Sequence, residues 1–189
     1  MEMSHVIKTQ HIAAAIHTSG NMDVRYYLNG VFVDSRVIVS TDGYCASAYL
    51  GEECKEYLPP FIIPIDAAKL IAKLKSSRVE AALLPDGRID IGGVVLKPVD
   101  GKFPGYKKCI FVGKAGTEAH KLQFSPELVM KFQKVAQSLK ASCRVPALYA
   151  TEGGVGFRVA IQGKESEFMG VLMPFDLKGA PFVCGDWLI

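Results

Sequence analysis

Few residues of this chain have the types and spacings that chemistry requires. The four histidines, at positions 5, 11, 17 and 120, have no obvious nucleophile to assist. His11 and His17 are too far apart for an i, i+4 zinc pair, and no third ligand suggests itself. The 5 cysteines are scattered without a C-x-x-C pair, which is typical of reduced thiols in a cytoplasmic protein. We therefore predict no catalytic residue, no metal and no cofactor, and we expect a protein that is not an enzyme.

Two glycine-rich stretches also fail as nucleotide sites. The run GKAGT at 113–117 lacks the full phosphate-loop motif and does not join a strand to a helix. The run EGGVG at 152–156 lies between two strand-like segments, which favours a hairpin turn. Asp42 beside Gly43 could be a carboxylate at a strand end, but a turn held by an Asx side chain is the favoured interpretation.

The composition is that of an ordinary globular domain. The chain has 189 residues, of which 49% are hydrophobic and 22% charged, enough for one large or two small domains with a real core. The start, MEMSHVIK, is not a secretory signal, and no window approaches 18 uninterrupted apolar residues. We expect a cytoplasmic protein without a membrane span. The net charge of +3 alone does not identify a partner.

The chain reads as one β-α-β-β-β unit used three times, at about 1–58, 59–106 and 118–177. The predicted helices are 9–20, 65–77 and 125–142, each between a leading strand and three further strands. The third helix has the clearest start, with Ser125 as N-cap, Pro126 at the first helical position and Glu127 in the first turn. Its residues Leu128, Phe132, Val135 and Leu139 form one apolar face.

Lysines lie off the apolar faces of the second and third helices. They are Lys69, Lys73, Lys131 and Lys134. A solvated helix face explains them on its own. If the helices lined one channel, these lysines would instead meet phosphates without reading bases.

Five segments in order resemble the bacterial sliding clamp, the β subunit of the replicative DNA polymerase III. They are DVRYYLNGVFV, VSTDGYCASA, FIIPIDAAKLIAKL, VDGKFPGYKK and VLMPF, within residues 3–177. The resemblance implies an α+β DNA-clamp fold built of β-α-β-β-β units, with helices inside a ring and antiparallel sheets outside. It also implies a processivity factor that encircles duplex DNA. The DNA-binding residues that it implies are Arg25, Lys69, Lys73, Lys131 and Lys134.

The resemblance implies a second site, a hydrophobic pocket that binds linear motifs of polymerases and repair proteins. Its walls would come from the 28–45 hairpin, from the connector and from the last strand. They are Leu28, Thr41, Gly43, Tyr44, Cys45, Pro104, Lys108, Cys109, Leu172, Met173, Pro174 and Phe175. Leu28 and Leu172 could each be ordinary core residues of their strands.

The chain departs from the family pattern at both ends of this pocket. The usual His-Arg-Leu after Thr-Asp-Gly is replaced by Tyr44-Cys45-Ala46. The usual Met-Pro-Met-Arg-Leu is replaced by the segment 173–177, Met-Pro-Phe-Asp-Leu. An arginine has become neutral at one place and acidic at the other, so we expect a shifted motif preference.

The predicted domains are 1–106, a clamp domain of two units, 107–117, a linker, 118–177, a third half-domain unit, and 178–189, an apolar tail. Family members have six units, so a ring of about twelve would need four such chains. We expect self-association, with a tetramer favoured over a dimer, and a clamp loader is a possible partner. The alternative function is a clamp-derived adaptor or decoy that binds partner peptides without encircling DNA.

Overall fold

A computed structural model describes residues 4–54, 57–107, 124–151 and 156–174 of the chain. Its helices and strands follow the β-α-β-β-β pattern. We call the three copies of this pattern unit 1, unit 2 and unit 3, in chain order. Unit 1 comprises β1 (Ser4–Lys8), α1 (Thr9–Ala15), β2 (Gly30–Asp34), β3 (Val37–Thr41) and β4 (Cys45–Leu50). Unit 2 comprises β5 (Phe61–Pro64), α2 (Ile65–Ile71), β6 (Arg78–Leu83), β7 (Ile89–Ile91) and β8 (Val94–Leu96). The described part of unit 3 comprises α4 (Pro126–Ser138), β9 (Ala147–Ala150), β10 (Phe157–Ala160) and β11 (Phe168–Leu172).

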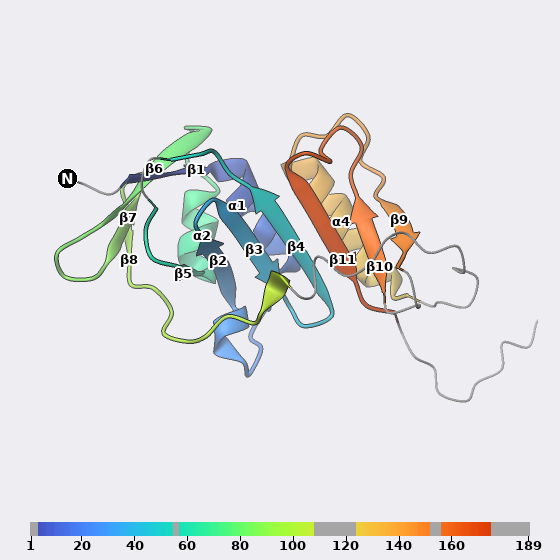
Figure 1. Cartoon of the computed structure of the whole chain (residues 1–189), viewed down its shortest axis with the longest axis horizontal. Helices are drawn as coiled ribbons and strands as arrows, with labels where there is room; N and C mark the ends of the chain where they lie inside the picture. Colours follow the sequence, from blue (N-terminus) through green and yellow to red (C-terminus); the bar gives the residue numbers. More distant parts are fainter. Residues whose placement is uncertain (1–3, 55–56, 108–123, 152–155, 175–189) are drawn as a thin grey trace, which may run out of the picture.

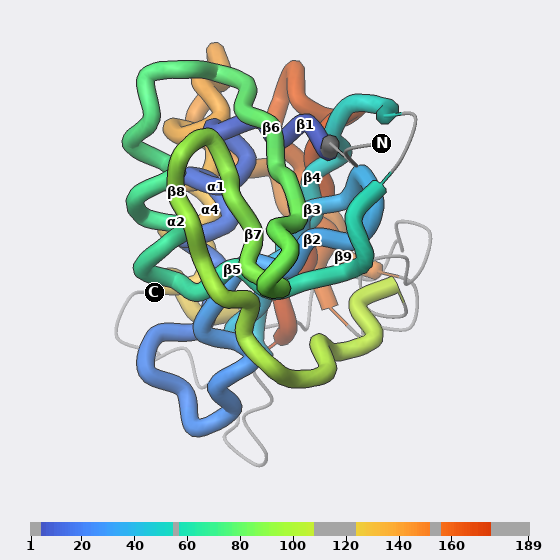
Figure 2. Tube along the Cα trace, turned by 90° about the vertical axis from the view of Figure 1, so that its left-hand side faces the viewer, coloured from blue at the N-terminus to red at the C-terminus, as the bar shows by residue number. Residues whose placement is uncertain are grey.

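Units 1 and 2 exchange their first strands. Strand β1 leaves its own unit and pairs antiparallel with β6, from Ser4 opposite Ala82 to Lys8 opposite Arg78. In return, β5 pairs antiparallel with β2, and Val33 lies opposite Phe61. The first sheet therefore has the order β1-β6-β7-β8, and its strands β6–β8 face the viewer in Figure 2. Each of these two units therefore completes the sheet of the other.

Unit 3 joins this domain by extending the sheet of unit 1. Strand β11 pairs antiparallel with β4, from Phe168 opposite Tyr49 to Leu172 opposite Cys45, which makes a seven-stranded sheet of order β5-β2-β3-β4-β11-β10-β9. Gly170 in the middle of β11 lets the helix approach, since a Cβ there would lie 2.7 Å from the Phe132 ring. Figure 1 shows the strands of unit 3 continuing the sheet beyond β4.

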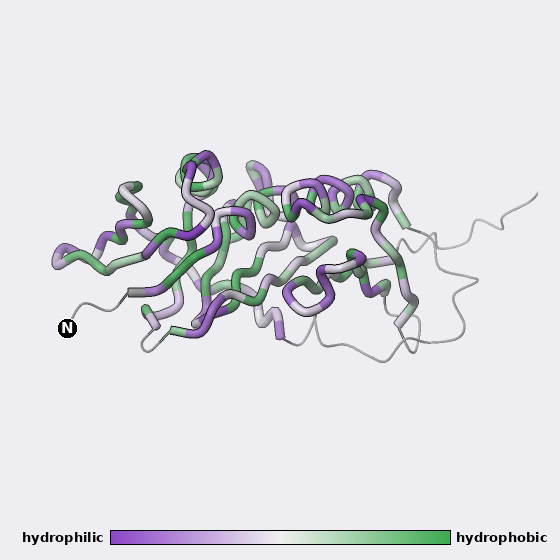
Figure 3. Tube along the Cα trace, turned by 90° about the horizontal axis from the view of Figure 1, so that it is seen from above, coloured by the Kyte–Doolittle hydropathy of each residue, from purple (hydrophilic) through white to green (hydrophobic). Residues whose placement is uncertain are grey.

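The three described α-helices cover one face of the sheets (Figures 1 and 3). Helix α1 packs between α2 and α4, and the core beneath them includes the fully buried Ile12, Tyr49, Ile71 and Phe132. Burial of a side chain the size of Phe132 stabilises the fold by about 2–3 kcal/mol. None of the helices in the described residues is long and apolar enough to cross a bilayer.

The opposite face of the seven-stranded sheet carries a second apolar cluster. Phe103 stacks on Phe32 with ring centroids 4.6 Å apart, and Tyr106 donates a hydrogen bond from its hydroxyl to Asp34 over 2.9 Å. The segment 97–107 is thereby held against the outside of the sheet. The helices and this segment consequently lie on opposite faces.

The predicted α+β clamp fold is confirmed, with local differences. The second helix ends at Ile71 rather than at residue 77, because the following turn switches to i→i−3 hydrogen bonds at Lys73 and Leu74. The third helix begins at Pro126 after Ser125 as expected, although the Ser125 side chain makes no capping hydrogen bond. Strand β2 begins at Gly30, since Tyr26–Leu28 just before it form a 3₁₀ turn, although the sequence RYYLNGVFV at 25–33 has the pattern of one continuous strand. Most of the predicted 107–117 linker and the whole 178–189 tail lie outside the described residues.

A cluster of charged groups ties unit 3 to unit 1. Glu167, just before β11, accepts hydrogen bonds from Lys164 at 2.8 Å, from His11 at 3.2 Å and from Lys8 at 3.4 Å. Burial alone raises the pKa of Glu167, but the hydrogen bonds from Lys164 and His11 outweigh it and lower the pKa to about 2. Burial lowers the pKa of His11, and its Nδ1 has no partner among the described residues, so the neutral ring is favoured.

These shifts predict a loss of stability in mild acid. Burial also lowers the pKa values of His5 and His17, so the unfolded chain takes up protons before the native chain as the pH falls below 6.5. The pKa of Glu167 is depressed as well, but its stabilisation is lost only as the pH falls from its unfolded value toward about 2. Between pH 7 and 5 the histidines therefore dominate. We expect the free energy of unfolding, measured by urea denaturation, to fall with pH by at most about 1.4 kcal/mol per pH unit for each histidine.

The variant His11→Gln tests the assignment, because it keeps a hydrogen-bond donor for Glu167 and removes the titration. Its free energy of unfolding should depend less on pH than that of the wild type. An unchanged slope between pH 7 and 5 would contradict a neutral, buried His11.

Candidate functional site

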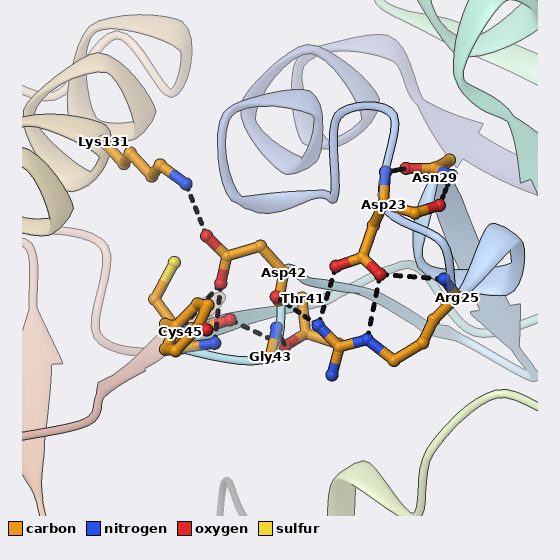
Figure 4. Close-up of polar contacts among 9 residues, drawn as sticks. Asp23, Arg25, Asn29, Thr41, Asp42, Gly43, Cys45 and Lys131 are labelled. Atoms are coloured by element: carbon orange, nitrogen blue, oxygen red, sulfur yellow. Dashed lines mark hydrogen bonds and ion pairs between the residues drawn. The ribbon is translucent and has the colours of Figure 1, made fainter.

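The turn between β3 and β4 is built by its own side chains. The Asp42 carboxylate accepts hydrogen bonds through Oδ1 from the backbone N–H groups of Tyr44 and Cys45, each at 2.8 Å. Thr41 Oγ1 donates to the Cys45 carbonyl at 2.7 Å and accepts from the Gly43 N–H at 3.0 Å. This is the Asx turn that the sequence indicated (Figure 4). It leaves Gly43 and Tyr44 exposed.

A second loop packs against this turn through Arg25. The Arg25 guanidinium binds both oxygens of Asp23, with Nε–Oδ1 3.0 Å and Nη2–Oδ2 2.7 Å, and donates to the Asp42 carbonyl over 3.2 Å. The Arg25 side chain lowers the pKa of Asp23 to about 2. Asn29 closes the loop, since its Oδ1 accepts from the Asp23 N–H and its Nδ2 donates to the Asp23 carbonyl. Arg25 therefore already has acidic and carbonyl partners in its own chain (Figure 4).

Lys131 reaches the same turn from unit 3. Its ammonium group forms a short ion pair with Oδ2 of Asp42, the oxygen that the backbone N–H groups leave free (Figure 4). Burial favours a raised pKa for Asp42, but the hydrogen bonds from Lys131 and from the backbone reverse this and lower the pKa. Asp42 thus connects α4 with the β3–β4 turn. Lys131 is consequently paired within the chain, whereas the sequence predicted it to face DNA.

The other predicted DNA-binding lysines are exposed. Lys69 forms only a surface ion pair with Asp66 at 3.3 Å, and such pairs contribute less than about 1 kcal/mol. Lys73 lies just past the end of α2, and Lys134 lies on α4. Both are exposed. Lys69, Lys73 and Lys134 belong to the helical layer, on the side of the molecule away from the segment 97–107.

The structure brings together part of the predicted peptide pocket. Cys45 pairs with Leu172, and the Met173 N–H donates to the Tyr44 carbonyl at 2.9 Å, so the turn and the end of β11 are adjacent. Tyr44 and Met173 are exposed, whereas Leu28 and Leu172 are 1% and 0% exposed and belong to the interior. Pro174 is half-buried at the end of the described chain.

Of the remaining predicted wall residues of the pocket, the structure describes Pro104. Pro104 is exposed on the outer segment and accepts a hydrogen bond from the Tyr106 N–H. Lys108, Cys109 and Phe175 lie outside the described residues. Two other hollows lie away from these walls. One, of about 310 Å³, is lined by Phe32, Ile62 and Val99, and another, of about 210 Å³, is lined by Val37, Leu50 and Met169.

Sequence reasoning missed the polar partners of the site. It did not identify Asp23 and Asn29, which position Arg25, or the pairing of Asp42 with Lys131. The Asp23-x-Arg25 spacing is a local signal for the first ion pair, but Asp42 and Lys131 are 89 positions apart. In the part of the chain that the structure describes, no group of three or more His, Cys, Asp or Glu side chains could hold a metal ion.

Comparisons with known proteins identify the fold. No protein-family model matches the sequence, and no curated protein matches it significantly. Solved structures match closely, although their sequence identities are low. The DNA polymerase III β subunit of Thermotoga maritima aligns over 93% of this chain and 66% of its own, with a TM-score of 0.67 and 13% identity.

Two further clamps agree with this match. The DNA polymerase sliding clamp of Pseudomonas aeruginosa aligns over 93% of this chain and 67% of its own, with a TM-score of 0.60 and 17% identity. The sliding clamp of Bartonella birtlesii, bound to griselimycin, aligns over 93% and 66%, with a TM-score of 0.62 and 17% identity. The chain thus spans about two thirds of the length of these clamps.

The chain has the fold of the bacterial sliding clamps. More particularly, it is structurally similar over 93% of its length to the DNA polymerase III β subunit, at low sequence identity. The resemblance predicted from the sequence is therefore confirmed at the level of the fold.

The geometry of the turn predicts a specific role for Gly43. Gly43 has φ +91°, and a Cβ at this position would lie 2.8 Å from both terminal nitrogens of Arg25. Gly87, with φ +81°, has open space around the same position and is a matched control. Each glycine-to-alanine change should cost about 1 kcal/mol for the left-handed backbone. We expect Gly43→Ala to lower the free energy of unfolding further than Gly87→Ala, because it also displaces Arg25.

Urea denaturation of the two variants measures this difference directly. Equal losses of stability would show that the Arg25 side chain moves away from Gly43 without cost.

Proposed function

We propose that this chain is a subunit of a sliding-clamp-like processivity factor that encircles duplex DNA. The clamp fold over 93% of the chain is the observation that carries the proposal. Exposed lysines on the helical layer support it, since Lys69, Lys73 and Lys134 belong to the layer that lines the hole in a clamp ring. Lys131 contributes less to DNA binding than these three lysines, because its charge is already paired with Asp42. Contacts of this kind bind phosphates without reading sequence.

The ring requires several copies of the chain. Three units per chain and about twelve units per ring correspond to four chains, and we favour this tetramer over a dimer. A ring closed around DNA is retained by topology, so weak individual contacts are sufficient. A loader that opens the ring and a partner DNA polymerase are the expected accessory proteins, in the cytoplasm.

A second proposed activity is the binding of partner peptides where the β3–β4 turn meets the end of β11. The exposed Tyr44 and Met173, next to the buried Leu172, provide apolar surface there. In an interface, a few such anchors supply most of the binding free energy. The Bartonella birtlesii and Pseudomonas aeruginosa clamps have both been solved with bound griselimycin, which supports ligand binding by this fold.

Retention on DNA tests the ring. We expect the protein to remain with closed circular plasmid during gel filtration and to be lost after the plasmid is linearised. The triple variant Lys69→Ala/Lys73→Ala/Lys134→Ala should lower the slope of log affinity against log salt by about one unit per lysine. Removal of Lys97, Lys102 and Lys107 from the outer segment is the matched control and should leave the slope unchanged.

Binding that is the same on circular and linear DNA would contradict encirclement. Absence of DNA binding together with retained peptide binding would favour the adaptor or decoy.

The altered turn predicts an altered peptide preference. A peptide with the standard clamp-binding motif should bind this chain at least tenfold more weakly than it binds the Pseudomonas aeruginosa clamp. The reason is the replacement of His-Arg-Leu by Tyr44-Cys45-Ala46. Fluorescence polarisation with one labelled peptide measures both proteins. Equal affinities would contradict the shift.

The variant Met173→Ala tests the location of the pocket. It should weaken the remaining binding, while Val95→Ala, at a similarly exposed position on β8, should not.

A further inference from the structure

Lys131 differs from the other lysines of the helical layer in its partner. Lys73 and Lys134 are exposed and have no ion pair within the part of the chain that the structure describes. Lys131, in contrast, is paired with Asp42, and the side chains of the two are only 33% and 13% exposed. Lys131 therefore brings less unpaired charge to the helical layer than either of the exposed lysines.

Within this pair, Asp42 is the fixed partner and Lys131 the movable one. The carboxylate is held by the turn, because its Oδ1 accepts hydrogen bonds from the backbone N–H groups of Tyr44 and Cys45, each at 2.8 Å. The ammonium group of a lysine lies at the end of a flexible aliphatic chain. Lys131 also precedes the exposed Lys134 by three positions on α4, and residues at this spacing are neighbours on a helix surface. Rotation of its own side chain can therefore carry the Lys131 ammonium group from Asp42 to the exposed surface of the layer.

The chemistry of the pair allows an exchange of anions. Burial lowers the pKa of Lys131, but the hydrogen bond and the charge of Asp42 outweigh burial and raise it, so the ammonium group is charged at neutral pH. The negative charge of Glu127, one turn earlier on the same helix, also raises this pKa. A DNA phosphate offers a lysine the same kind of ligand as Asp42 does, an anionic oxygen. Asp42 thus engages a charge that a phosphate could bind in its place.

We propose that Asp42 and the phosphates of duplex DNA compete for Lys131. Without DNA the turn holds the lysine, and in the complex a phosphate draws it away, so Asp42 is an intramolecular inhibitor of one DNA contact. The inference rests on the DNA binding proposed above, and it adds a connection between the helical layer and the β3–β4 turn. It requires a phosphate contact but not a closed ring, so a short linear duplex is a sufficient probe.

The competition extends to the proposed peptide site. Lys131 pairs with Oδ2 of Asp42, so its departure removes the cation from a half-buried carboxylate (Figure 4). The charged form of Asp42 then loses the stabilisation that the ammonium group supplied. The same carboxylate holds the Tyr44 N–H, and the Tyr44 carbonyl accepts from the Met173 N–H. Because linkage is reciprocal, DNA and a ligand that requires the intact turn weaken each other's binding by the same factor.

Fluorescence polarisation with a labelled linear duplex across a salt series measures the competition. The variant Asp42→Asn keeps the side-chain oxygen that accepts from Tyr44 and Cys45 and removes the negative charge. It should make the slope of log affinity against log salt steeper by about one unit for each Lys131 that reaches a phosphate. The double variant Asp42→Asn/Lys131→Met should lose this gain. Lys131→Met should change the slope less in the wild type than in the Asp42→Asn background.

The matched control is Glu127→Gln. It removes the same charge from an exposed residue one turn from Lys131, and Glu127 forms no ion pair with Lys131 in the described structure. We expect the slope of this variant to equal the wild-type slope. Circular dichroism shows whether each variant remains folded.

A second measurement follows Asp42 itself. An NMR titration of the carboxyl carbons should show that saturation with the duplex raises the pKa of Asp42, because its cationic partner is drawn away. Asp86, which is paired with Arg88 in the turn between β6 and β7, is the internal reference, and its pKa should change less. A purely structural role of the Lys131 pair would leave the pKa of Asp42 the same with and without DNA.

The outcomes separate this inference from the proposed function. An unchanged slope for Asp42→Asn, an equal steepening by Glu127→Gln, or a gain that persists in the double variant would overturn the competition and leave DNA binding intact. A pKa of Asp42 that DNA does not raise would mean that Lys131 stays with the turn. Absence of DNA binding by the wild type and by Asp42→Asn at low salt would overturn both the competition and the proposed DNA binding.

Discussion

The arrangement of this protein follows from the need of each β-strand to satisfy its backbone groups along two edges. A β-α-β-β-β unit alone leaves both sides of its sheet open. Units 1 and 2 solve this by exchanging β1 and β5, and unit 3 attaches by pairing β11 with β4. Each pairing joins strands that are separated in the sequence, and together they produce the clamp fold and its two sheets.

The pairing of β4 with β11 also assembles the candidate sites. It brings the Tyr44 carbonyl to the Met173 N–H and places α4 so that Lys131 reaches Asp42. At the other end of the same strands it places Glu167 beside His11. Both contacts cross between unit 3 and unit 1, so both ends of this junction constrain how unit 3 sits on unit 1.

Charge is used differently on the two faces of the molecule. Lys69, Lys73 and Lys134 are exposed on the helical layer. In contrast, Lys131 of α4 is engaged by Asp42, and Arg25 of the loop before β2 is engaged by Asp23. On the opposite face, apolar contacts such as Phe32 with Phe103 hold the outer segment. The engaged residues support the β3–β4 turn instead, and Lys131 thereby connects that turn with α4.

The sequence alone determined the repeated unit, the α+β class, the start of α4 and the Asx turn at 41–45. Hydrophobic period, capping residues and turn chemistry are local, so they can be read within a few positions. The sequence did not decide whether Leu28 and Leu172 belong to the core or to the predicted peptide pocket, since their burial depends on distant strands. Only the tertiary structure decided the strand exchange and the pairing of Lys131 with Asp42. Both depend on which strand edges and which charged side chains meet although they are far apart in the sequence. Local propensities and residue spacings do not contain that information.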